Sequence, residues 1–365
     1  MTGDGTDQGA RPEALVGGRF DVEVGPVAHG GHFVARHEGR VIFTRHALPG
    51  ELVTVEITED SGRFLRGEAV DVAVPSSHRV QPPCPLAHPG GCGGCDFQHV
   101  ELSEQRRLKA SVVAEQLSRL AGLDREVVVE PVPGDRDGLF WRTRMQYVHL
   151  PDGRRGLRKH RSHEVVPVDW CLIAHPEARE PDRSGPVVEQ VETVHGTHRF
   201  TVAGDGFWQV HPGAPRVLVE TVLSMLAPQP GERALDLYAG VGLFSAFLAE
   251  QVGVDGAVTA IEGDQRATEL AAENLAGQPQ ASVVHDRVDR AVRRLDADAV
   301  DLVVLDPPRA GAKRQVVRAV TGLAPRAVAY VACDPAALAR DVAYFAEQAY
   351  RLADLRAFDL FPMTH

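Results

Sequence analysis

The stretch ERALDLYAGVGLFSAFLAE, residues 232–250, decides the fold of this chain. Its first apolar run predicts a buried strand, and Gly240 and Gly242 predict a tight turn in which the backbone can approach a ligand. The apolar residues that follow predict an amphipathic helix. A second strand is expected in AVTAIEGD, residues 257–264, ending on Glu262. A strand, a helix and a further strand are typical of a parallel α/β sheet.

Two further apolar runs, residues 301–305 and 327–332, predict buried parallel strands of the same sheet. They lead into the motifs DPPRAG (306–311) and ACDP (332–335). Open α/β sheets bind ligands at the carboxyl ends of their strands, so a thiol at Cys333 could attack a substrate beside a bound cofactor. An isolated cysteine is more often a buried structural residue. Here Asp334 and Pro335 end the strand at the thiol, which favours a thiol that faces the crevice.

The turn after the first strand indicates an adenosine cofactor. An acid about 20 residues beyond the glycines, here Glu262, can accept hydrogen bonds from ribose hydroxyls. The dinucleotide fingerprint wants a third glycine or alanine where this chain has Ser245, which disfavours a pyrophosphate at this helix. A lone Gly-x-Gly turn is weak evidence. Together with Glu262 and DPP at a later strand end, it favours S-adenosylmethionine.

Five motifs together resemble the RNA uracil-5-methyltransferases in order and spacing: FWQV (207–210), DLYAGVGLFS, IEGD, DPPRAG and ACDP. The resemblance runs from about residue 18 to the end of the chain. Arg309 stands where amino-group methyltransferases carry an aromatic residue that stacks on the base, so methylation of an exocyclic nitrogen is disfavoured. The resemblance implies that Cys333 adds to carbon 6 of uracil. It assigns to the S-adenosylmethionine pocket Gln209, Tyr238, Glu262 and Asp306.

Covalent addition explains the need for a cysteine, because carbon 5 of uracil is a weak nucleophile until a thiolate adds to carbon 6. An ordinary thiol is only a few per cent ionised at neutral pH, so the surroundings of Cys333 should lower its pKa. The candidates are Arg309 and the ends of nearby helices.

The other four of the five cysteines predict a metal site. Cys84, Cys92 and Cys95 lie in CPLAHPGGCGGC, and Cys171 follows a hydrophobic segment. Reduced thiols without a metal and disulfides of a secreted protein are the alternatives. Four thiolates serve zinc as well as an iron–sulfur cluster, and the spacing alone does not decide. The resemblance favours a [4Fe–4S] cluster, although the seven residues between the first two cysteines exceed the usual five.

The expected fold class is α/β, with a class I methyltransferase Rossmann-like sheet preceded by two other domains. Residues 1–14 are expected to be a disordered tail. Frequent short β-like runs in residues 15–75 predict a small β-barrel, which resembles the oligonucleotide-binding-like TRAM domain that grips RNA. Residues 76–205 are expected to form a central α+β domain with the cysteines, including a helix over residues 102–120 and a strand-rich section after Trp141. Residues 206–365 are expected to form the methyltransferase domain.

Composition favours an intracellular enzyme over a membrane protein. No stretch approaches the roughly 18 apolar residues that a membrane span needs, and the N-terminus lacks a signal peptide's basic start and apolar core. We expect a cytoplasmic monomer. The net charge of −11 does not indicate nucleic-acid binding. A local basic stretch does, although it could equally be a solvated hairpin; its members are Arg136, Arg142, Arg144, Arg154, Arg155, Arg158, Lys159 and Arg161.

The sequence thus predicts S-adenosylmethionine-dependent methylation of carbon 5 of a uridine in RNA. A TRAM-like barrel together with the cysteine set favours 23S rRNA over tRNA as the substrate. The resemblance also places a general-base glutamate and a last strand of the sheet beyond Thr364 and His365, where the sequence stops. We therefore keep as the alternative a catalytically impaired relative that binds RNA or metal.

Overall fold

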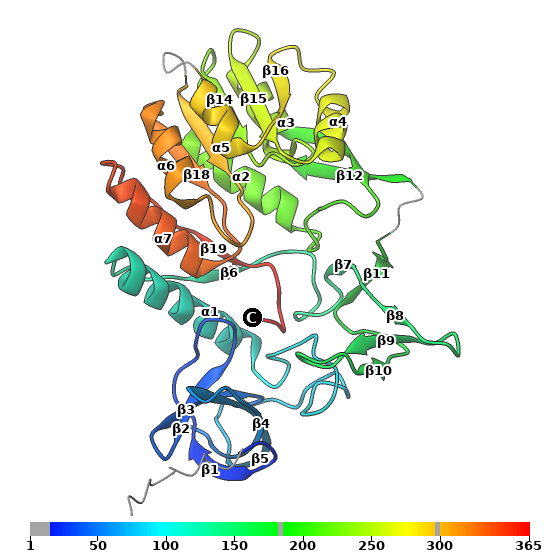
Figure 1. Cartoon of the computed structure of the whole chain (residues 1–365). Coiled ribbons are helices and arrows are strands. Elements are labelled where there is room, and N and C mark those ends of the chain that lie inside the picture. Colours follow the sequence, from blue (N-terminus) through cyan, green and yellow to red (C-terminus); the bar gives the residue numbers. More distant parts are fainter. Residues whose placement is uncertain (1–14, 182–184, 296–299) are drawn as a thin grey trace, which may run out of the picture. The chain divides into compact units, whose positions relative to one another are not determined.

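The computed structural model of the chain describes residues 15–181, 185–295 and 300–365 (Figure 1). The tail expected over residues 1–14 lies outside the described residues. The chain forms two compact units. The first comprises the described residues up to Glu101, with Lys159–Ser162 and Thr364–His365, and the second comprises Leu102–Arg158 and His163–Met363.

The first unit is built on a five-stranded sheet in the order β1-β4-β5-β3-β2. Strands β3 and β5 run parallel, and the other neighbours are antiparallel. Bulges interrupt the pairing of β4 with β5, and bulges increase strand twist and bending, as a small barrel requires. The strands are β1 (Arg19–Glu23), β2 (Phe33–His37), β3 (Arg40–Arg45), β4 (Leu52–Asp60) and β5 (Phe64–Val74). All five lie within residues 15–75, where the sequence predicts a small β-barrel.

The second unit opens with a helix and a series of short strands. The predicted helix over residues 102–120 is confirmed, and it ends in one π-helical turn capped by Gly122. The predicted strand-rich section after Trp141 is also confirmed. Its elements are α1 (Leu102–Gln116), η1 (Leu117–Ala121), β6 (Val129–Pro131), β7 (Arg142–Arg144), β8 (Val148–His149), β9 (Arg155–Arg158), β10 (Val165–Pro167), β11 (Ala174–Arg179), β12 (Pro186–Thr193) and β13 (Gly196–Ala203).

The rest of the second unit is the predicted α/β sheet, in the order β16-β15-β14-β17-β18 with all neighbours parallel. Its elements are α2 (Ala214–Leu226), β14 (Arg233–Leu237), α3 (Leu243–Val252), β15 (Ala257–Glu262), α4 (Gln265–Asn274), β16 (Ala281–His285), α5 (Val288–Ala291), η2 (Val292–Arg294), β17 (Leu302–Leu305), α6 (Lys313–Gly322), β18 (Ala327–Tyr330) and α7 (Pro335–Ala346). A last strand, β19 (Ala357–Asp359), pairs with β6.

Helices cover both faces of this sheet (Figure 1). One face packs against α2, α3 and the β12–β13 hairpin, and the other packs against α5, α6 and α7. The expectation that α3 is amphipathic is wrong, because eight of its ten residues are buried. It lies between the sheet, α2 and the hairpin, and therefore has almost no solvent face. No helix within the described residues is both long and apolar enough to cross a membrane.

A buried carboxylate holds the turn ALPGE, residues 47–51, between β3 and β4 in the first unit. The Glu51 side chain is fully buried and accepts two hydrogen bonds of 2.6 Å from the guanidinium of Arg79. It also accepts the backbone N–H groups of Leu48 (2.8 Å) and Ser76 (3.0 Å). Burial alone would raise the pKa of Glu51, but these donors hold it below its ordinary value.

We expect Glu51→Gln to lower the free energy for opening this sheet by about 3 kcal/mol, because it leaves the Arg79 charge without its partner. The carboxylate's contribution is present above the ordinary glutamate pKa and is lost as the pH falls through the lowered native value. The difference between the two proteins should therefore shrink in acid. Hydrogen exchange of the β1–β5 peptides in the full chain measures both effects.

The matched control is Glu56→Gln, which removes an exposed ion pair with Arg19 on the same sheet. It should change the same exchange by less than about 0.5 kcal/mol. An equal effect of the two substitutions would show that the buried carboxylate does not hold the turn.

Candidate functional site

Four parallel strands of the second unit end at one edge of the sheet. Leu237 of β14 pairs with Ile261 of β15 and with Leu305 of β17, which in turn pairs with Tyr330 of β18. The segments that follow this row therefore start level with one another. They include most of the predicted site: Tyr238, Gly240, Gly242, Glu262, Asp306 and Cys333. Gln209 lies elsewhere, half-buried in the segment between β13 and α2, and its role stays a prediction.

The turn after β14 has the backbone that the sequence predicts. Gly240 has φ 56° and Gly242 has φ 90°, in the left-handed region that favours glycine. Tyr238 takes φ 64° in the same turn, which is uncommon for a residue with a side chain. The N–H of Gly240 donates to one carboxylate oxygen of Glu262 (2.9 Å), and the N–H of Asp264 donates to the other (2.7 Å). Glu262 is therefore fixed beside the turn with oxygens that can accept further hydrogen bonds, as ribose hydroxyls require.

A buried acid beneath this turn was missed in the sequence. Asp236 is fully buried within β14, and one of its oxygens accepts the N–H (2.9 Å) and the hydroxyl (2.6 Å) of Ser245. Burial raises the pKa of Asp236 to about 6, against the effect of the Ser245 hydrogen bonds and with that of the Glu262 charge. The signal was present, because an acid inside an otherwise apolar strand needs a partner. It also explains Ser245 at the helix position where a dinucleotide site has glycine or alanine.

Asp306 at the end of β17 is coupled to this buried acid. Burial, and then the charge of Asp236, raise the pKa of Asp306 to about 7. Burial, Asp289, Asp341 and Glu262 likewise raise the pKa of the Tyr238 phenol to about 12. These groups are buried beside other acids, and both effects disfavour their ionised forms. A bound cation would restore the ionised form of Asp306 and be stabilised by it.

Cys333 follows β18 and precedes α7, where the sequence predicts it. Asp334 caps the helix by accepting the N–H of Ala337 (2.7 Å), and Pro335 occupies the first turn. The residue is exposed. The expectation that its surroundings lower the thiol pKa is wrong: partial burial of the thiol raises the pKa, the Arg309 cation opposes this, and Asp306 and Asp334 add to it. Of the two candidates, Arg309 is the group that acts in the expected direction.

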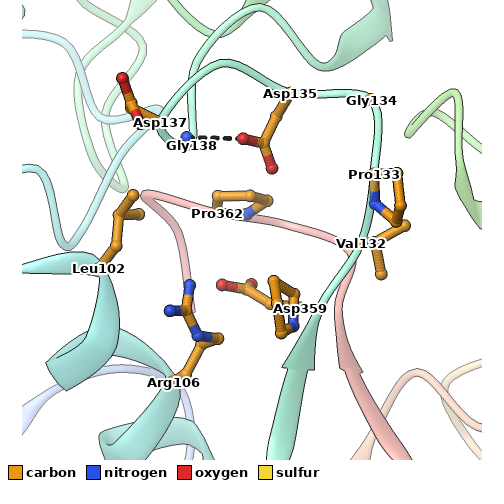
Figure 2. A pocket seen from close by; sticks show the side chains of 11 residues that line it. Leu102, Arg106, Val132, Pro133, Gly134, Asp135, Asp137, Gly138, Asp359 and Pro362 are labelled. Carbon is orange, nitrogen blue, oxygen red and sulfur yellow. Dashed lines mark hydrogen bonds between the residues drawn. The ribbon is translucent and has the colours of Figure 1, made fainter.

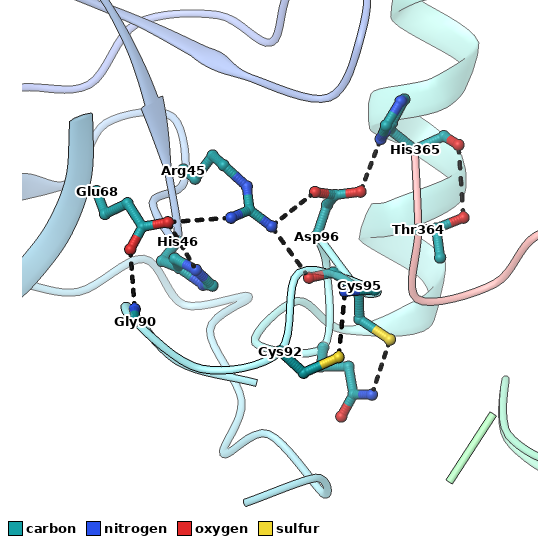
Figure 3. A network of polar contacts seen from close by, with 11 residues as sticks. Arg45, His46, Glu68, Gly90, Cys92, Cys95, Asp96, Thr364 and His365 are labelled. Carbon is teal, nitrogen blue, oxygen red and sulfur yellow. Dashed lines mark hydrogen bonds and ion pairs between the residues drawn. The ribbon is translucent and has the colours of Figure 1, made fainter. Parts of the chain in front are cut away.

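The cysteine loop of the first unit lies on the β-sheet through a buried arginine (Figure 3). Arg45 of β3, only 4% exposed, forms ion pairs of 3.0 Å with Glu68 of β5 and with Asp96 of the loop. The second oxygen of Glu68 accepts the N–H of Gly90, at 3.1 Å. Two strands of the sheet therefore fix both arms of the loop.

Two of the three sulfur atoms of this loop accept hydrogen bonds. The N–H of Gly94 donates to the Sγ of Cys92 (3.4 Å), and the Nε2 of Gln98 donates to the Sγ of Cys95 (3.2 Å) (Figure 3). The side-chain oxygen of Gln98 accepts the N–H of Cys84 (3.0 Å). Such donors stabilise metal-bound thiolates. Within the described residues, no group of three or more His, Cys, Asp or Glu side chains is arranged to hold a metal ion. The cysteines of this loop therefore fit a metal by the hydrogen-bond donors to their sulfur atoms and not by their arrangement.

Cys171, the fourth predicted ligand, is half-buried in the second unit between β10 and β11. The metal therefore stays a prediction on all four positions.

Arginines of the basic stretch, residues 136–161, make different kinds of contact. The guanidinium of Arg144 donates to the backbone oxygens of Gly206 and Asp205, which is a structural role. Arg154 pairs with Asp152 at 2.8 Å, and both side chains are largely exposed, as in a solvated hairpin. An RNA-facing role of the stretch stays a prediction.

A pocket of about 440 Å³ opens in the second unit beside α1 (Figure 2). Its polar groups are one arginine, Arg106, and three acids. Of these, Asp359 pairs with Lys109 at 2.6 Å, and Asp135 accepts the N–H of Gly138 at 2.9 Å. None of the predicted S-adenosylmethionine residues lines it, so it is separate from the strand-end site. The lining residues are Leu102, Arg106, Pro131, Val132, Pro133, Gly134, Asp135, Asp137, Gly138, Asp359 and Pro362.

Two family models match the chain. The TRAM domain matches residues 13–70, and the methyltransferase small domain matches residues 214–332. The first match covers strands β1 to β4 and most of β5. The second covers β14 to β18 with Tyr238, Glu262 and Asp306, and it ends one residue before Cys333.

Several proteins are similar to the chain over nearly its whole length. An uncharacterized RNA methyltransferase of Streptomyces coelicolor is 45% identical, over 97% of this chain and 92% of that protein. One from Streptomyces avermitilis is 44% identical over 96% of each chain, and one from Bifidobacterium longum is 36% identical over 98% and 96%. Full-length identity at this level, with the TRAM and methyltransferase matches, places the chain in a family of TRAM-containing RNA methyltransferases.

Proposed function

We propose that the protein methylates carbon 5 of a uridine in RNA, with S-adenosylmethionine as the methyl donor and Cys333 as the nucleophile. The observation that carries this proposal is the position of Cys333 at the end of β18, on the same sheet edge as Glu262 and Asp306. A thiol has no use in a direct methyl transfer to nitrogen or oxygen. It is needed where the accepting carbon must first be activated.

Each strand end has a part in this proposal. The backbone at Gly240 and Gly242 allows close approach of the adenosine part, and Glu262 accepts hydrogen bonds from its ribose. Asp306 lies at the end of the neighbouring strand with its pKa raised to about 7, where a sulfonium charge would be stabilised. Gln209 and Tyr238 complete the pocket by resemblance to the family. When bound, S-adenosylmethionine supplies an electrophilic methyl group.

The covalent sequence runs through Cys333. Its thiolate adds to carbon 6 of the uracil ring, which places the electron pair of the carbon 5–carbon 6 double bond on carbon 5 as an enolate. Carbon 5 takes the methyl group and then loses its proton to a base, and the returning electron pair expels the cysteine. Arg309 is the cation that favours the thiolate. The transfer leaves S-adenosylhomocysteine, and the result is 5-methyluridine and an unchanged enzyme.

The proposed substrate is 23S rRNA, with tRNA as the alternative. The family name of the relatives and the TRAM match support RNA as the substrate class. The choice of 23S rRNA rests on the combination of a TRAM-like barrel with the cysteine set.

We also propose that Cys84, Cys92, Cys95 and Cys171 hold a [4Fe–4S] cluster, with zinc as the alternative. The hydrogen bonds to the sulfurs of Cys92 and Cys95 support a metal-bound thiolate, and no catalytic step is assigned to it.

We expect the affinity for S-adenosylmethionine to rise as the pH is raised through neutrality. Asp306 loses its proton with a pKa of about 7, and only the ionised form attracts the sulfonium. Asp306→Asn should remove this dependence and weaken binding above neutral pH roughly tenfold, the equivalent of about one pKa unit. Calorimetric titration across pH measures both.

Two controls sharpen this test. S-adenosylhomocysteine carries no sulfonium and should bind with a flatter pH dependence. Asp255→Asn, at an exposed acid before β15, should leave both ligands unaffected. Parallel pH curves for the two ligands would contradict the role given to Asp306.

We expect Cys333→Ala to abolish methylation and the covalent adduct with RNA together. Transcripts of 23S rRNA and tRNA that carry 5-fluorouridine should trap the wild-type protein, because fluorine at carbon 5 cannot leave as a proton. The trapped complex should survive denaturing gel electrophoresis, and only the transcript class that is the substrate should form it. Cys333→Ser is the conservative control and should also fail to turn over.

Methylation of carbon 5 by Cys333→Ala would show that the nucleophile is wrongly assigned. An adduct on ordinary RNA without methylated product would favour the impaired relative.

We expect protein purified without oxygen to be brown and to contain about four irons and four sulfides per chain, as a [4Fe–4S] cluster requires. Cys171→Ala should remove the colour and the iron. Colourless protein with one zinc ion under the same conditions would instead favour the tetrahedral alternative. The control is Cys333→Ala, which should keep the full metal content.

A further inference from the structure

A buried carboxylate on α7 connects the DPPRAG loop with the end of β18, the strand that leads to the proposed nucleophile. The side chain of Asp341 is fully buried. Its Oδ2 accepts hydrogen bonds from the hydroxyl of Tyr330 (2.7 Å), the N–H of Ala312 (2.6 Å) and the N–H of Lys313 (3.1 Å). Its Oδ1 faces the guanidinium of Arg340 at 3.6 Å. One oxygen atom therefore holds the end of the DPPRAG loop and the end of β18 at the same point.

The loop is shaped to fit this carboxylate. Gly311 has φ 74°, and a Cβ placed on it would lie 2.5 Å from the Oδ2 of Asp341, so the position requires glycine for two reasons. Lys313 also has φ in the left-handed region, at 70°. A residue with a side chain keeps such a conformation only where its surroundings hold it. Here the carboxylate accepts the N–H of that residue, and Arg340 donates to the backbone oxygen of Ala310 (2.8 Å).

The end of β18 is held through the phenol of Tyr330. Tyr330 is the last residue of β18, three positions before Cys333. Its hydroxyl donates to Asp341 and accepts the N–H of Ala312 at 3.1 Å. Burial and the Asp341 hydrogen bond raise the pKa of Tyr330, so the phenol keeps the proton that it donates. The DPPRAG loop and the strand that leads to the thiol are thus joined directly as well as through Asp341.

We propose that Asp341 is a positioning residue that fixes Arg309, through the loop 310–313 and Tyr330, beside the thiol of Cys333. This inference rests on the proposed function, because it assumes that Cys333 is the nucleophile. Arg309 is exposed and lies directly before the clamped segment. Without the clamp, its charge would not be held at one place relative to the thiol.

The charges that act on Cys333 give the proposal a definite sign. The largest are those of Arg309 from the DPPRAG loop, Asp306 from the end of β17 and Asp334 from the start of α7. Arg309 is the only cation of the three, and Asp341 is not among them. Loss of the clamp should therefore raise the pKa of the thiol through loss of Arg309. Simple removal of a negative charge near a thiol would have the opposite effect.

The test measures alkylation of Cys333 in the full chain without RNA or S-adenosylmethionine. The rate is followed against pH with iodoacetamide, and the Cys333 peptide is quantified by mass spectrometry so that other thiols do not interfere. Asp341→Ala, Tyr330→Phe and Arg309→Gln should each shift the alkylation profile to higher pH. Asp341→Asn keeps an oxygen acceptor and should give a smaller shift. The control is Glu347→Gln, which removes an exposed ion pair between Arg314 of α6 and the end of α7. It should not shift the alkylation profile.

Methylation kinetics give a second readout. Asp341→Ala should lower kcat roughly 10- to 100-fold with little change in the KM for S-adenosylmethionine, as a misplaced catalytic group would. If Asp341→Ala does not fold, Tyr330→Phe and Asp341→Asn carry the test. The proposal is overturned if the folded variants keep the wild-type alkylation profile, or if the profile moves to lower pH.

The outcome for Cys333→Ala is a separate matter. If that variant still methylates RNA, the proposed function fails, while the alkylation profile still tests whether Asp341 positions Arg309.

Discussion

A parallel sheet must end all its strands at the same edge, and the candidate site depends on that constraint. Tyr238, Glu262, Asp306 and Cys333 are separated by up to about a hundred residues, yet each follows a strand at the same level of the ladder. The pairing register of the strands sets this level. A shift of the register by one residue would turn every side chain of a strand to the opposite face. The sheet thus brings these residues to one edge, and contacts outside the ladder, such as those of Glu262 with the glycine turn, then fix the side chains.

Buried carboxylates adapt this common scaffold, and their surroundings decide what each can do. Glu51 is surrounded by donors, stays ionised and closes a turn. Asp236 and Asp306 have too few donors for two neighbouring acids, so their pKa values rise toward neutrality. Asp341 gathers three donors on a single oxygen and joins two loops. A carboxylate with several hydrogen-bond donors joins chain segments, whereas a carboxylate with few donors is available to bind a cation.

Local sequence predicted the elements well and their side-chain environments less well. The Gly-x-Gly turn, the strand ending on Glu262 and the helix from residue 102 follow from short-range patterns, and the structure has all three. The thiol pKa of Cys333 was assigned the wrong direction, because it depends first on the partial burial of the thiol and then on acids that include Asp306 from the end of another strand. Asp236 and Asp341 were overlooked for a similar reason: their partners lie 9 to 29 residues away and only the fold brings them together. The buried surface of α3 also depends on its neighbours in the fold.

That last feature limits how this protein can diverge. With eight of ten residues buried, α3 offers almost no position where a polar substitution would be harmless. Close-packed protein interiors respond to a change of even one methylene group. Volume-conserving apolar exchanges are the changes that it can absorb. Substitutions should therefore accumulate in exposed helices such as α4 while the segment 243–252 changes slowly. A detectable sequence signature should then extend from the glycine turn through the whole helix, well beyond the residues that touch a ligand.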